Sequence, residues 1–188
     1  MRVIAGEAKG RRLKGPAGPW TRPMADKIKE ALFSTLGSLG VEPDTVLDLY
    51  AGTGSVGIEA LSRGATAADF VDQHAASCAV IRNNLALTGY DNVSRVHQVA
   101  VEQFIARGRH PFDLIVIDPP YADPQILDTL ERVGNSRLVQ SGTIVAVGHW
   151  PRLQLPPRID GLNRLRSRCH GDSCFSIYEV ADAAEENE

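Results

Sequence analysis

Four consecutive residues with chemical potential follow an apolar run that spans residues 114–117: Asp118, Pro119, Pro120 and Tyr121. The run predicts a buried parallel strand, and open α/β sheets bind ligands at the carboxyl ends of such strands. Proline fixes φ and supplies a carbonyl without a competing N–H. We therefore expect stiff hydrogen-bond acceptors beside a flat ring, which suits a planar substrate with an exocyclic amine. The alternative is an ordinary turn that ends a strand.

A glycine-rich segment is the second candidate, as a cofactor site. It lies between a predicted strand and a predicted helix and presents Asp48, Tyr50, Ala51, Gly52, Thr53 and Gly54. Its glycines allow a tight turn and a close approach of the backbone to a ligand. With Gly57 they also satisfy G-x-G-x-x-G, which would fit a nicotinamide dinucleotide. Asp48 favours S-adenosylmethionine instead, because an acid at that strand end can hold a cationic amino-acid head.

Two further strand ends could complete an adenosine site. Asp72 closes the second predicted strand about twenty residues after the glycines, where an acid accepts hydrogen bonds from ribose hydroxyls, and Gln73 follows it. Ala100 and Val101 follow the third strand, where backbone groups could bind the adenine edge. These features fit any adenosine ligand and do not separate the two cofactors.

The elements that must position these residues alternate along the chain. The apolar pattern predicts strands at 46–49, 68–71, 95–99, 114–117, 143–147, 162–168 and 176–180, and helices at 56–63, 75–88, 101–106 and 124–133. This order predicts a Rossmann-like α/β fold with a mostly parallel seven-stranded sheet, whose last two strands form an antiparallel hairpin. We expect residues 41–182 to form this domain and 183–188 to be an acidic tail.

Residues 1–40 are expected to form a separate basic extension, with a short β-hairpin and a helix that Pro23 opens. Residues 1–30 hold eight Lys and Arg residues against three acids, a net +5, whereas the remainder carries −8 of the total −3. A basic arm on an acidic body indicates a polyanionic partner, although a solvated basic surface would look the same. Arg158, Arg164, Arg166 and Arg168 form a second basic stretch.

Cysteine content and hydropathy indicate a cytosolic protein. The three cysteines, Cys78, Cys169 and Cys174, are odd in number and lack paired metal spacing, so we expect reduced thiols and no metal site. No stretch approaches membrane-spanning length, and the first residues lack the apolar core of a signal peptide.

Several motifs together resemble the RsmD family of bacterial 16S ribosomal RNA (guanine-N2)-methyltransferases. They cover almost the whole chain: Arg2-Val-Ile-Ala-Gly6, Gly10-Arg-Arg-Leu13, Arg22-Pro23, Glu30-Ala-Leu-Phe33, Leu47-Asp-Leu-Tyr-Ala-Gly52, Glu59-Ala-Leu-Ser-Arg-Gly64 and Asp118–Tyr121. The chain departs from the family pattern at Met24, Ala100 and Gly148, where Thr, Asp or Asn, and Glu are common.

The resemblance implies a monomeric enzyme that uses S-adenosylmethionine without a metal. Its substrate would be 16S rRNA or the assembling small ribosomal subunit. Asp118 and the Pro119 carbonyl would accept hydrogen bonds from the guanine amine, and Tyr121 would stack on the base. RNA phosphates would contact the basic extension through Arg2, Arg11, Arg12, Lys14, Arg22 and Lys27.

Three alternatives remain at this point. The same amine-binding residues could serve adenine N6 or a protein glutamine. The G-x-G-x-x-G pattern could belong to a dinucleotide-dependent oxidoreductase, where Asp118–Tyr121 would have no role. The chain could also be a non-catalytic RNA-binding protein, although such a protein would have no need of the acid in Asp118-Pro119-Pro120-Tyr121.

Overall fold

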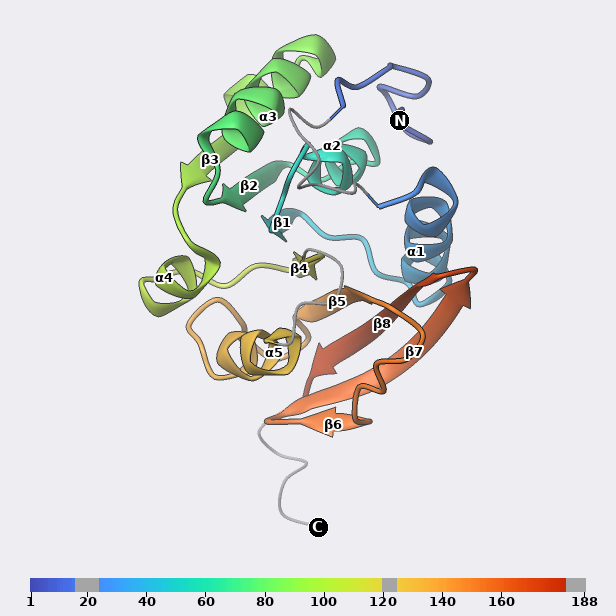
Figure 1. Cartoon of the computed structure of the whole chain (residues 1–188), viewed down its shortest axis with the longest axis vertical. Helices are drawn as coiled ribbons and strands as arrows, with labels where there is room; N and C mark the ends of the chain where they lie inside the picture. Colours follow the sequence, from blue (N-terminus) through green and yellow to red (C-terminus); the bar gives the residue numbers. More distant parts are fainter. Residues whose placement is uncertain (16–23, 120–124, 182–188) are drawn as a thin grey trace.

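The fold is built on one central sheet, seen in a computed structural model that describes residues 1–15, 24–119 and 125–181 (Figure 1). Its strand order is β3-β2-β1-β4-β5-β8-β7-β6, with β1 to β5 parallel and the last three antiparallel. The strands are β1 (Thr45–Leu49), β2 (Ala67–Asp72), β3 (Ser94–Gln98), β4 (Leu114–Ile117), β5 (Ile144–His149), β6 (Arg158–Ile159), β7 (Leu162–His170) and β8 (Ser173–Val180).

Helices cover both faces of this sheet. They are α1 (Asp26–Ser38), α2 (Ser55–Ser62), α3 (Ala75–Thr88), α4 (Val101–Ala106) and α5 (Ile126–Gly134), with a 3₁₀ turn η1 (Asp91–Val93). None of the helices in the described ranges is long and apolar enough to cross a membrane. The predicted α/β class is confirmed, and the sheet contains the seven predicted strands plus the two-residue β6.

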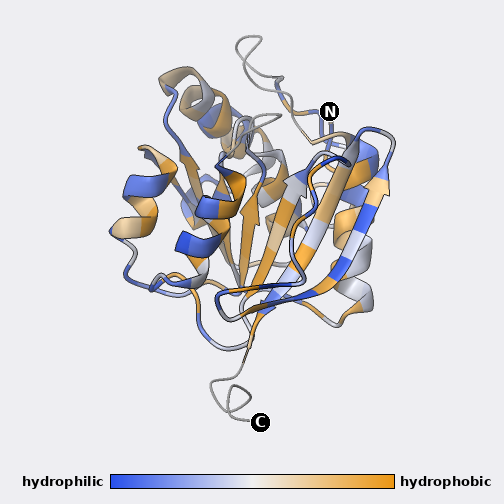
Figure 2. Cartoon of the chain, turned by 60° about the horizontal axis from the view of Figure 1, so that its bottom comes forward, coloured by the Kyte–Doolittle hydropathy of each residue, from blue (hydrophilic) through white to orange (hydrophobic). Residues whose placement is uncertain are grey.

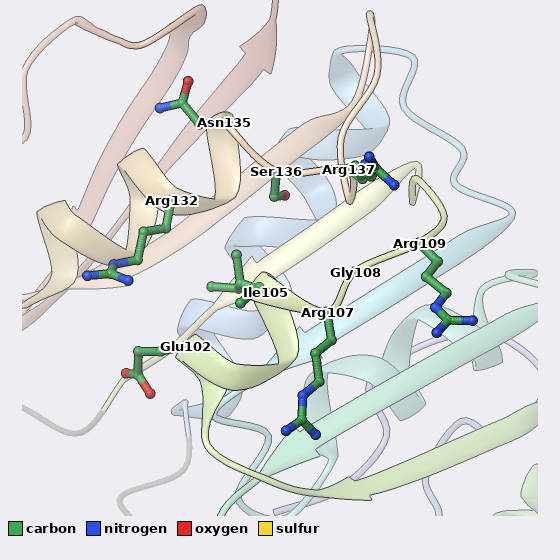
Figure 3. A pocket seen from close by; sticks show the side chains of 10 residues that line it. Glu102, Ile105, Arg107, Gly108, Arg109, Arg132, Asn135, Ser136 and Arg137 are labelled. Carbon is green, nitrogen blue, oxygen red and sulfur yellow. The ribbon is translucent and has the colours of Figure 1, made fainter.

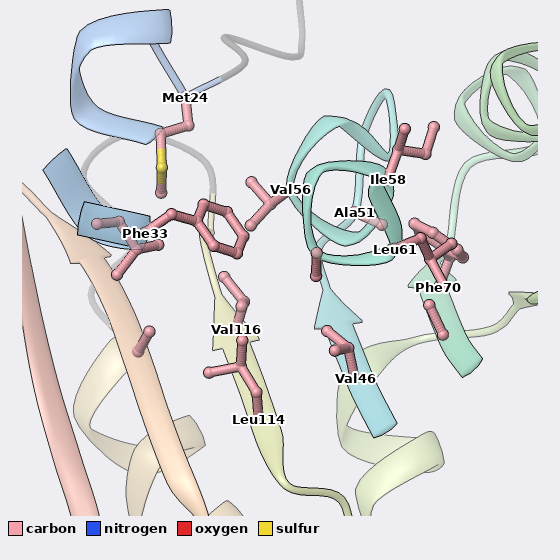
Figure 4. Packing of buried hydrophobic residues seen from close by; sticks show 14 of the residues in the cluster. Met24, Phe33, Val46, Ala51, Val56, Ile58, Leu61, Phe70, Leu114 and Val116 are labelled. Carbon is pink, nitrogen blue, oxygen red and sulfur yellow. The ribbon is translucent and has the colours of Figure 1, made fainter. Parts of the chain in front are cut away.

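Alternation along the central strands produces two cores. In β4, Leu114 and Val116 join the cluster under α1, α2 and α3, whereas Ile115 and Ile117 join the cluster under α4 and α5. A parallel strand that is buried on both faces must be apolar at every position, which explains the continuous run. Figure 2 shows hydrophobic residues along the central strands and hydrophilic residues on the outward faces of helices, and Figure 4 shows the first cluster.

The two arms of the N-terminal extension pair antiparallel, as predicted, over a short stretch. Arg2 and Arg12 form a β-bridge, the Val3 N–H donates to the Arg11 carbonyl at 3.0 Å, and the Gly10 N–H donates to the Val3 carbonyl at 2.9 Å. The segment is also held by α2, because the Glu59 carboxylate accepts hydrogen bonds from the backbone N–H groups of Ile4 and Ala5 at 2.7 and 3.0 Å. Gly6 has a φ of +81°, and a Cβ there would lie 1.6 Å from the Ser62 carbonyl oxygen. Only glycine allows this close docking.

Two expectations need correction. The first helix begins at Asp26 rather than at Pro23, which lies outside the described residues. Cys169 and Cys174 form a disulfide across β7 and β8, with their Cα atoms 4.0 Å apart, so they are not free thiols. Antiparallel pairing brings the two cysteines face to face, which an odd cysteine count conceals. Cys78 is free and buried, as expected.

Candidate active site

Three predicted site acids meet at one edge of the sheet. Asp48 lies in β1, Asp72 ends β2 and Asp118 follows β4, and both β2 and β4 pair with β1. Parallel strands end at the same edge, so the carboxyl ends of β2, β1 and β4 bring these side chains together. The Asp72 carboxylate accepts from the Gly52 N–H at 3.0 Å, and the Asp118 N–H lies 3.5 Å from the Leu49 carbonyl, so both acids adjoin the end of β1.

The glycine-rich loop connects β1 to α2 through a sharply turned backbone. Tyr50, Gly52 and Gly54 have φ values of 59°, 55° and 74°. The Gly54 N–H donates to the Ala51 carbonyl at 2.7 Å, and the Ala51 N–H donates to the Val71 carbonyl at 3.0 Å. A left-handed Tyr50 is uncommon and marks a constrained loop.

Asp48 is buried beneath this loop. One of its oxygens accepts a hydrogen bond from the Gly57 N–H at 2.9 Å. Burial raises the pKa of Asp48 to about 8. The hydrogen bond from Gly57 acts in the opposite direction and lowers this pKa, whereas the negative charges of Asp118 and Asp72 raise it further. A cation beside Asp48 would stabilise its charged form.

Gly57 has a packing role. A Cβ at this position would lie 2.4 Å from Cε1 of the Phe70 ring. The third glycine of the G-x-G-x-x-G pattern is therefore required by the contact between α2 and β2, as the pattern's third glycine often is. It does not by itself indicate a dinucleotide.

Asp72 fixes the loop from the neighbouring strand. Its two oxygens accept hydrogen bonds from the Gly52 N–H at 3.0 Å and the His74 N–H at 2.8 Å. Each carboxylate oxygen keeps a further acceptor position. Gln73 is exposed beside it, and the ribose contacts expected of Asp72 and Gln73 stay predictions.

Ala100 and Val101 lie where β3 passes into α4. Ala100 is the N-cap residue and makes no side-chain cap, and Val101 is buried. Alanine is a poor N-cap residue, because it has no side-chain oxygen to accept a hydrogen bond from the first turn of α4. Adenine contact by the backbone here stays a prediction.

Asp118 lies against Gly148, its neighbour at the end of β5. A Cβ at Gly148 would be 2.3 Å from Oδ1 of Asp118 and 3.6 Å from Cε of Met24. Gly148 therefore adjoins the candidate catalytic acid, and Met24 lies near Gly148. Burial raises the pKa of Asp118 to about 7. Pro119 is described, whereas Pro120 and Tyr121 lie outside the described residues.

A buried ion pair beneath the site was not predicted. The Lys29 ammonium lies 3.5 Å from the Glu59 carboxylate, and both side chains are fully buried. Lys29 also donates to the carbonyls of Arg2 at 2.9 Å and Ser55 at 3.4 Å, so it ties α1 to the extension and to α2. Burial lowers the pKa of Lys29. Lys29 lies four residues before Phe33, so both side chains are on the same face of α1. This spacing could have indicated that Lys29 faces the core.

Asn84 is a second contact that sequence reasoning missed. Its amide donates to the Thr53 carbonyl at 2.9 Å and the Lys14 carbonyl at 3.1 Å, and accepts from the Lys14 N–H at 2.8 Å. This buried side chain links the glycine-rich loop to the extension. A lone asparagine within a predicted helix provides no sequence signal for that role.

The candidate RNA-binding side chains are exposed, as that role requires: Arg2, Arg11, Arg12, Lys14 and Lys27. Arg11 donates to the Leu87 carbonyl at 3.0 Å, which leaves other guanidinium N–H groups for a ligand. Arg22 and the acidic tail 183–188 lie outside the described residues.

A separate cleft of about 560 Å³ lies between α4 and α5 (Figure 3). Its lining includes Arg107, Arg109, Arg132 and Arg137. The loops that carry Arg107, Arg109 and Arg137 lead into the amino ends of β4 and β5, so the cleft lies at the sheet edge opposite Asp118.

The comparisons with known proteins agree with this arrangement. A protein-family model described as "Conserved hypothetical protein 95" matches residues 1–179. A Bacillus subtilis protein named "Putative rRNA methyltransferase YlbH" is 32% identical over 182 residues, covering 95% of this chain and 98% of that protein. The Escherichia coli "Ribosomal RNA small subunit methyltransferase D" is 27% identical, covering 95% of this chain and 89% of that protein.

A solved structure shows the same fold. The Thermus thermophilus hypothetical protein TTHA0928 superposes with a TM-score of 0.80 at 30% identity, covering 96% of this chain and 99% of that one. One assignment accounts for the strand order, for the acids at the carboxyl ends of β1, β2 and β4, and for the family match over nearly the whole chain. The chain belongs to the family described as Conserved hypothetical protein 95, which is the RsmD family that its motifs resemble.

Proposed function

We propose that this protein transfers a methyl group from S-adenosylmethionine to the exocyclic N2 amine of a guanine in 16S ribosomal RNA. The observation that carries the proposal is Asp118, which follows β4 at the edge where β1 ends, with its N–H 3.5 Å from the Leu49 carbonyl and its carboxylate against Gly148. The names of the Bacillus and Escherichia relatives support an rRNA substrate.

The residues at the sheet edge fit this cofactor. Asp48 is a buried carboxylate that accepts a hydrogen bond from the Gly57 N–H, and burial raises its pKa to about 8, so a positively charged ligand group would compensate its charge. Asp72 would bind the ribose hydroxyls, and Ala100 with Val101 the adenine edge. When bound, the cofactor supplies an electrophilic methyl group on a sulfonium.

Asp118 and the Pro119 carbonyl would position the substrate amine. The amine lone pair of guanine is delocalised into the ring, so nitrogen is a weak nucleophile. Acceptors that bind both amine N–H groups direct the lone pair toward the methyl group and stabilise charge that develops on nitrogen. Proximity and orientation supply much of the remaining rate enhancement. Asp118 or water takes the departing proton.

The RNA would be bound by the extension and presented with its target base out of the stack. Arg2, Arg11, Arg12, Lys14, Arg22 and Lys27 would contact phosphates, which position RNA without reading its sequence. A base that enters the pocket must leave its helix, and stacking on Tyr121 would contribute about 1–3 kcal/mol. In this proposal residues 1–40 face the RNA, residues 41–182 catalyse, and a cytosolic monomer acts on 16S rRNA or the assembling subunit.

Adenine N6 and protein glutamine are the alternative substrates, because their amines suit the same acceptors. A dinucleotide-dependent oxidoreductase is disfavoured, since Asp118 would have no role in it.

The experiment is methyl transfer and cofactor binding by Asp118→Ala and Asp118→Asn beside the wild type. We expect loss of methylation by at least about 10²-fold, the size typical of removing one positioned transition-state group, with S-adenosylmethionine affinity retained. Full activity in Asp118→Ala would refute the catalytic assignment. Loss of cofactor binding together with activity would make Asp118 a cofactor ligand instead.

A further inference from the structure

Three arginines recur at every second position of β7: Arg164, Arg166 and Arg168. In a regular strand, residues two apart lie on the same face of the sheet. The second basic stretch would then be a single row of positive side chains. In the structure, the three arginines do not all lie on one face.

A β-bulge divides the row. Arg164 pairs with Tyr178, and Arg166 pairs with Ile177, so β7 contains one extra residue, Leu165, between them. A bulge bends the strand and re-aims its side chains, and bulges are common beside active sites. The side chains of Arg166 and Arg168, which follow Leu165, therefore lie on the opposite face of the sheet from that of Arg164.

Arg164 is directed to the face of Tyr178. Its guanidinium donates to the Leu155 carbonyl at 2.6 Å, and Tyr178 belongs to the core cluster under α4 and α5. Arg164 is partly buried and holds the loop before β6 against the sheet. This arginine has a structural role.

Arg166 and Arg168 are directed to the opposite face. Their cross-strand partners, Ile177 and Phe175, belong to the cluster under α1, and Leu165 packs against the same cluster. Both arginines are exposed, and among the described residues neither forms a salt bridge. Two charged guanidinium groups are thus available to a ligand.

Arg168 lies in line with the candidate catalytic acid. Arg168 pairs with Phe175, Phe175 pairs with Gly148, and Gly148 adjoins Asp118. Neighbouring strands are about 4.8 Å apart, so the three steps from β4 to β7 span about 14 Å. A short single-stranded segment of RNA can bridge that distance.

The basic extension lies on the other side of Asp118. It docks on α2 through Glu59 and on α3 through Asn84, beside β1 and β2 in the strand order. Figure 1 shows the N-terminal segment near α2 and α3, and the arrowhead of β7 beside α1. Asp118, at the end of the central β4, lies between the two basic surfaces.

We infer that Arg166 and Arg168 bind the phosphate backbone of the substrate RNA on the side of Asp118 opposite the extension. This inference rests on the proposed function. Guanidinium groups match phosphate with paired hydrogen bonds, and two separated phosphate contacts would hold the strand across the catalytic acid. The bulge at Leu165 is the element that turns both side chains toward the RNA.

The test compares variants with matched charge changes. R166E/R168E is the test variant, and R107E/R109E, in the cleft at the opposite sheet edge, carries the same change on exposed arginines. Methylation kinetics on the small subunit, RNA affinity at several salt concentrations, S-adenosylmethionine affinity and thermal unfolding are measured for each.

We expect R166E/R168E to raise KM for RNA at least tenfold, with kcat within about twofold of the wild type and cofactor affinity unchanged. R107E/R109E is expected to stay within about threefold of the wild-type KM. The milder R166Q/R168Q should lower the slope of log affinity against log salt by about 1.4, because each single-strand phosphate contact contributes about 0.7. R164Q should lower thermal stability and leave KM unchanged.

An unchanged KM in a folded R166E/R168E would overturn the inference, and so would an equal rise in R107E/R109E, which would indicate a general charge effect. If R166E/R168E does not fold, R166Q/R168Q decides by the same KM and salt slope. Failure of the wild type to methylate any RNA would instead refute the proposed function.

Discussion

Gly148 is the position where one added methyl group tests the geometry around Asp118. In Gly148→Ala the new Cβ would lie 2.3 Å from Oδ1 of Asp118, whereas ordinary contacts begin at 3.4 Å. The carboxylate must therefore move by about 1 Å. The other neighbour, Cε of Met24 at 3.6 Å, is already at an ordinary contact distance.

The expected consequence is a loss of rate rather than of folding. A misplacement of about 1 Å at a reacting centre can cost about 10²-fold, or about 2.7 kcal/mol of transition-state stabilisation. Overpacking typically costs about 1–3 kcal/mol of unfolding free energy. For a chain of this size, that lowers the melting temperature by about 2–12 °C, so the protein stays folded at 25 °C.

The assay measures kcat at saturating S-adenosylmethionine and RNA, together with cofactor affinity. Gly37→Ala is the matched control, because Gly37 lies in α1, has no atom within 4 Å of an added Cβ, and is exposed. We expect wild-type kcat in Gly37→Ala and about 1% of it in Gly148→Ala, with similar cofactor affinity. Wild-type kcat in Gly148→Ala would refute the placement of the Asp118 carboxylate as the group that positions the amine.

Three further predictions concern ionisable groups. Burial raises the pKa of Asp118 to about 7, and its carboxylate is the active form, so kcat/KM for S-adenosylmethionine should fall as the pH drops below about 7. The decline of kcat should begin at a lower pH, because the bound sulfonium favours the charged carboxylate. A flat pH profile would contradict this role. In Lys29→Met, Glu59 keeps Arg63 at 2.9 Å and the N–H groups of Ile4 and Ala5, whereas the carbonyls of Arg2 and Ser55 lose their donor. The unfolding free energy should therefore fall by about 1–3 kcal/mol in denaturant titrations, and no change would show that the Lys29 contacts are dispensable. Asp48 has a folded pKa of about 8, above its unfolded value, so its charge destabilises the fold increasingly from about pH 4 to about pH 8 and constantly above. The difference in unfolding free energy between Asp48→Asn and the wild type should therefore grow in favour of the variant from about pH 4 to about pH 8, while the variant loses cofactor affinity. A difference that does not change with pH would show that ionisation of Asp48 does not destabilise the fold.

The central elements could be predicted because their sequence patterns are strong. The strand at 114–117 and the helices at 75–88 and 101–106 match the structure to the residue. The strand is apolar throughout because it is buried on both faces. The placement of Asp48, Asp72 and Asp118 at one edge followed from parallel strand order alone.

Other features depend on tertiary contacts that no local pattern records. The extension docks on α2 because Glu59 accepts hydrogen bonds from the N–H groups of Ile4 and Ala5, which lie 55 and 54 residues away in the sequence. The bulge at Leu165 breaks an alternation that appeared regular in sequence. The lack of a side chain at Gly148 matters only because the Asp118 carboxylate lies where a Cβ would be.

The most direct test of the central claim is methyl transfer from labelled S-adenosylmethionine to small ribosomal subunits that lack this modification, followed by nucleoside analysis. We expect labelled N2-methylguanosine at a single site of 16S rRNA, and no label with Asp118→Ala. Label in adenine or in protein, or no label despite measurable cofactor binding, would contradict the proposed substrate and leave only the methyltransferase fold.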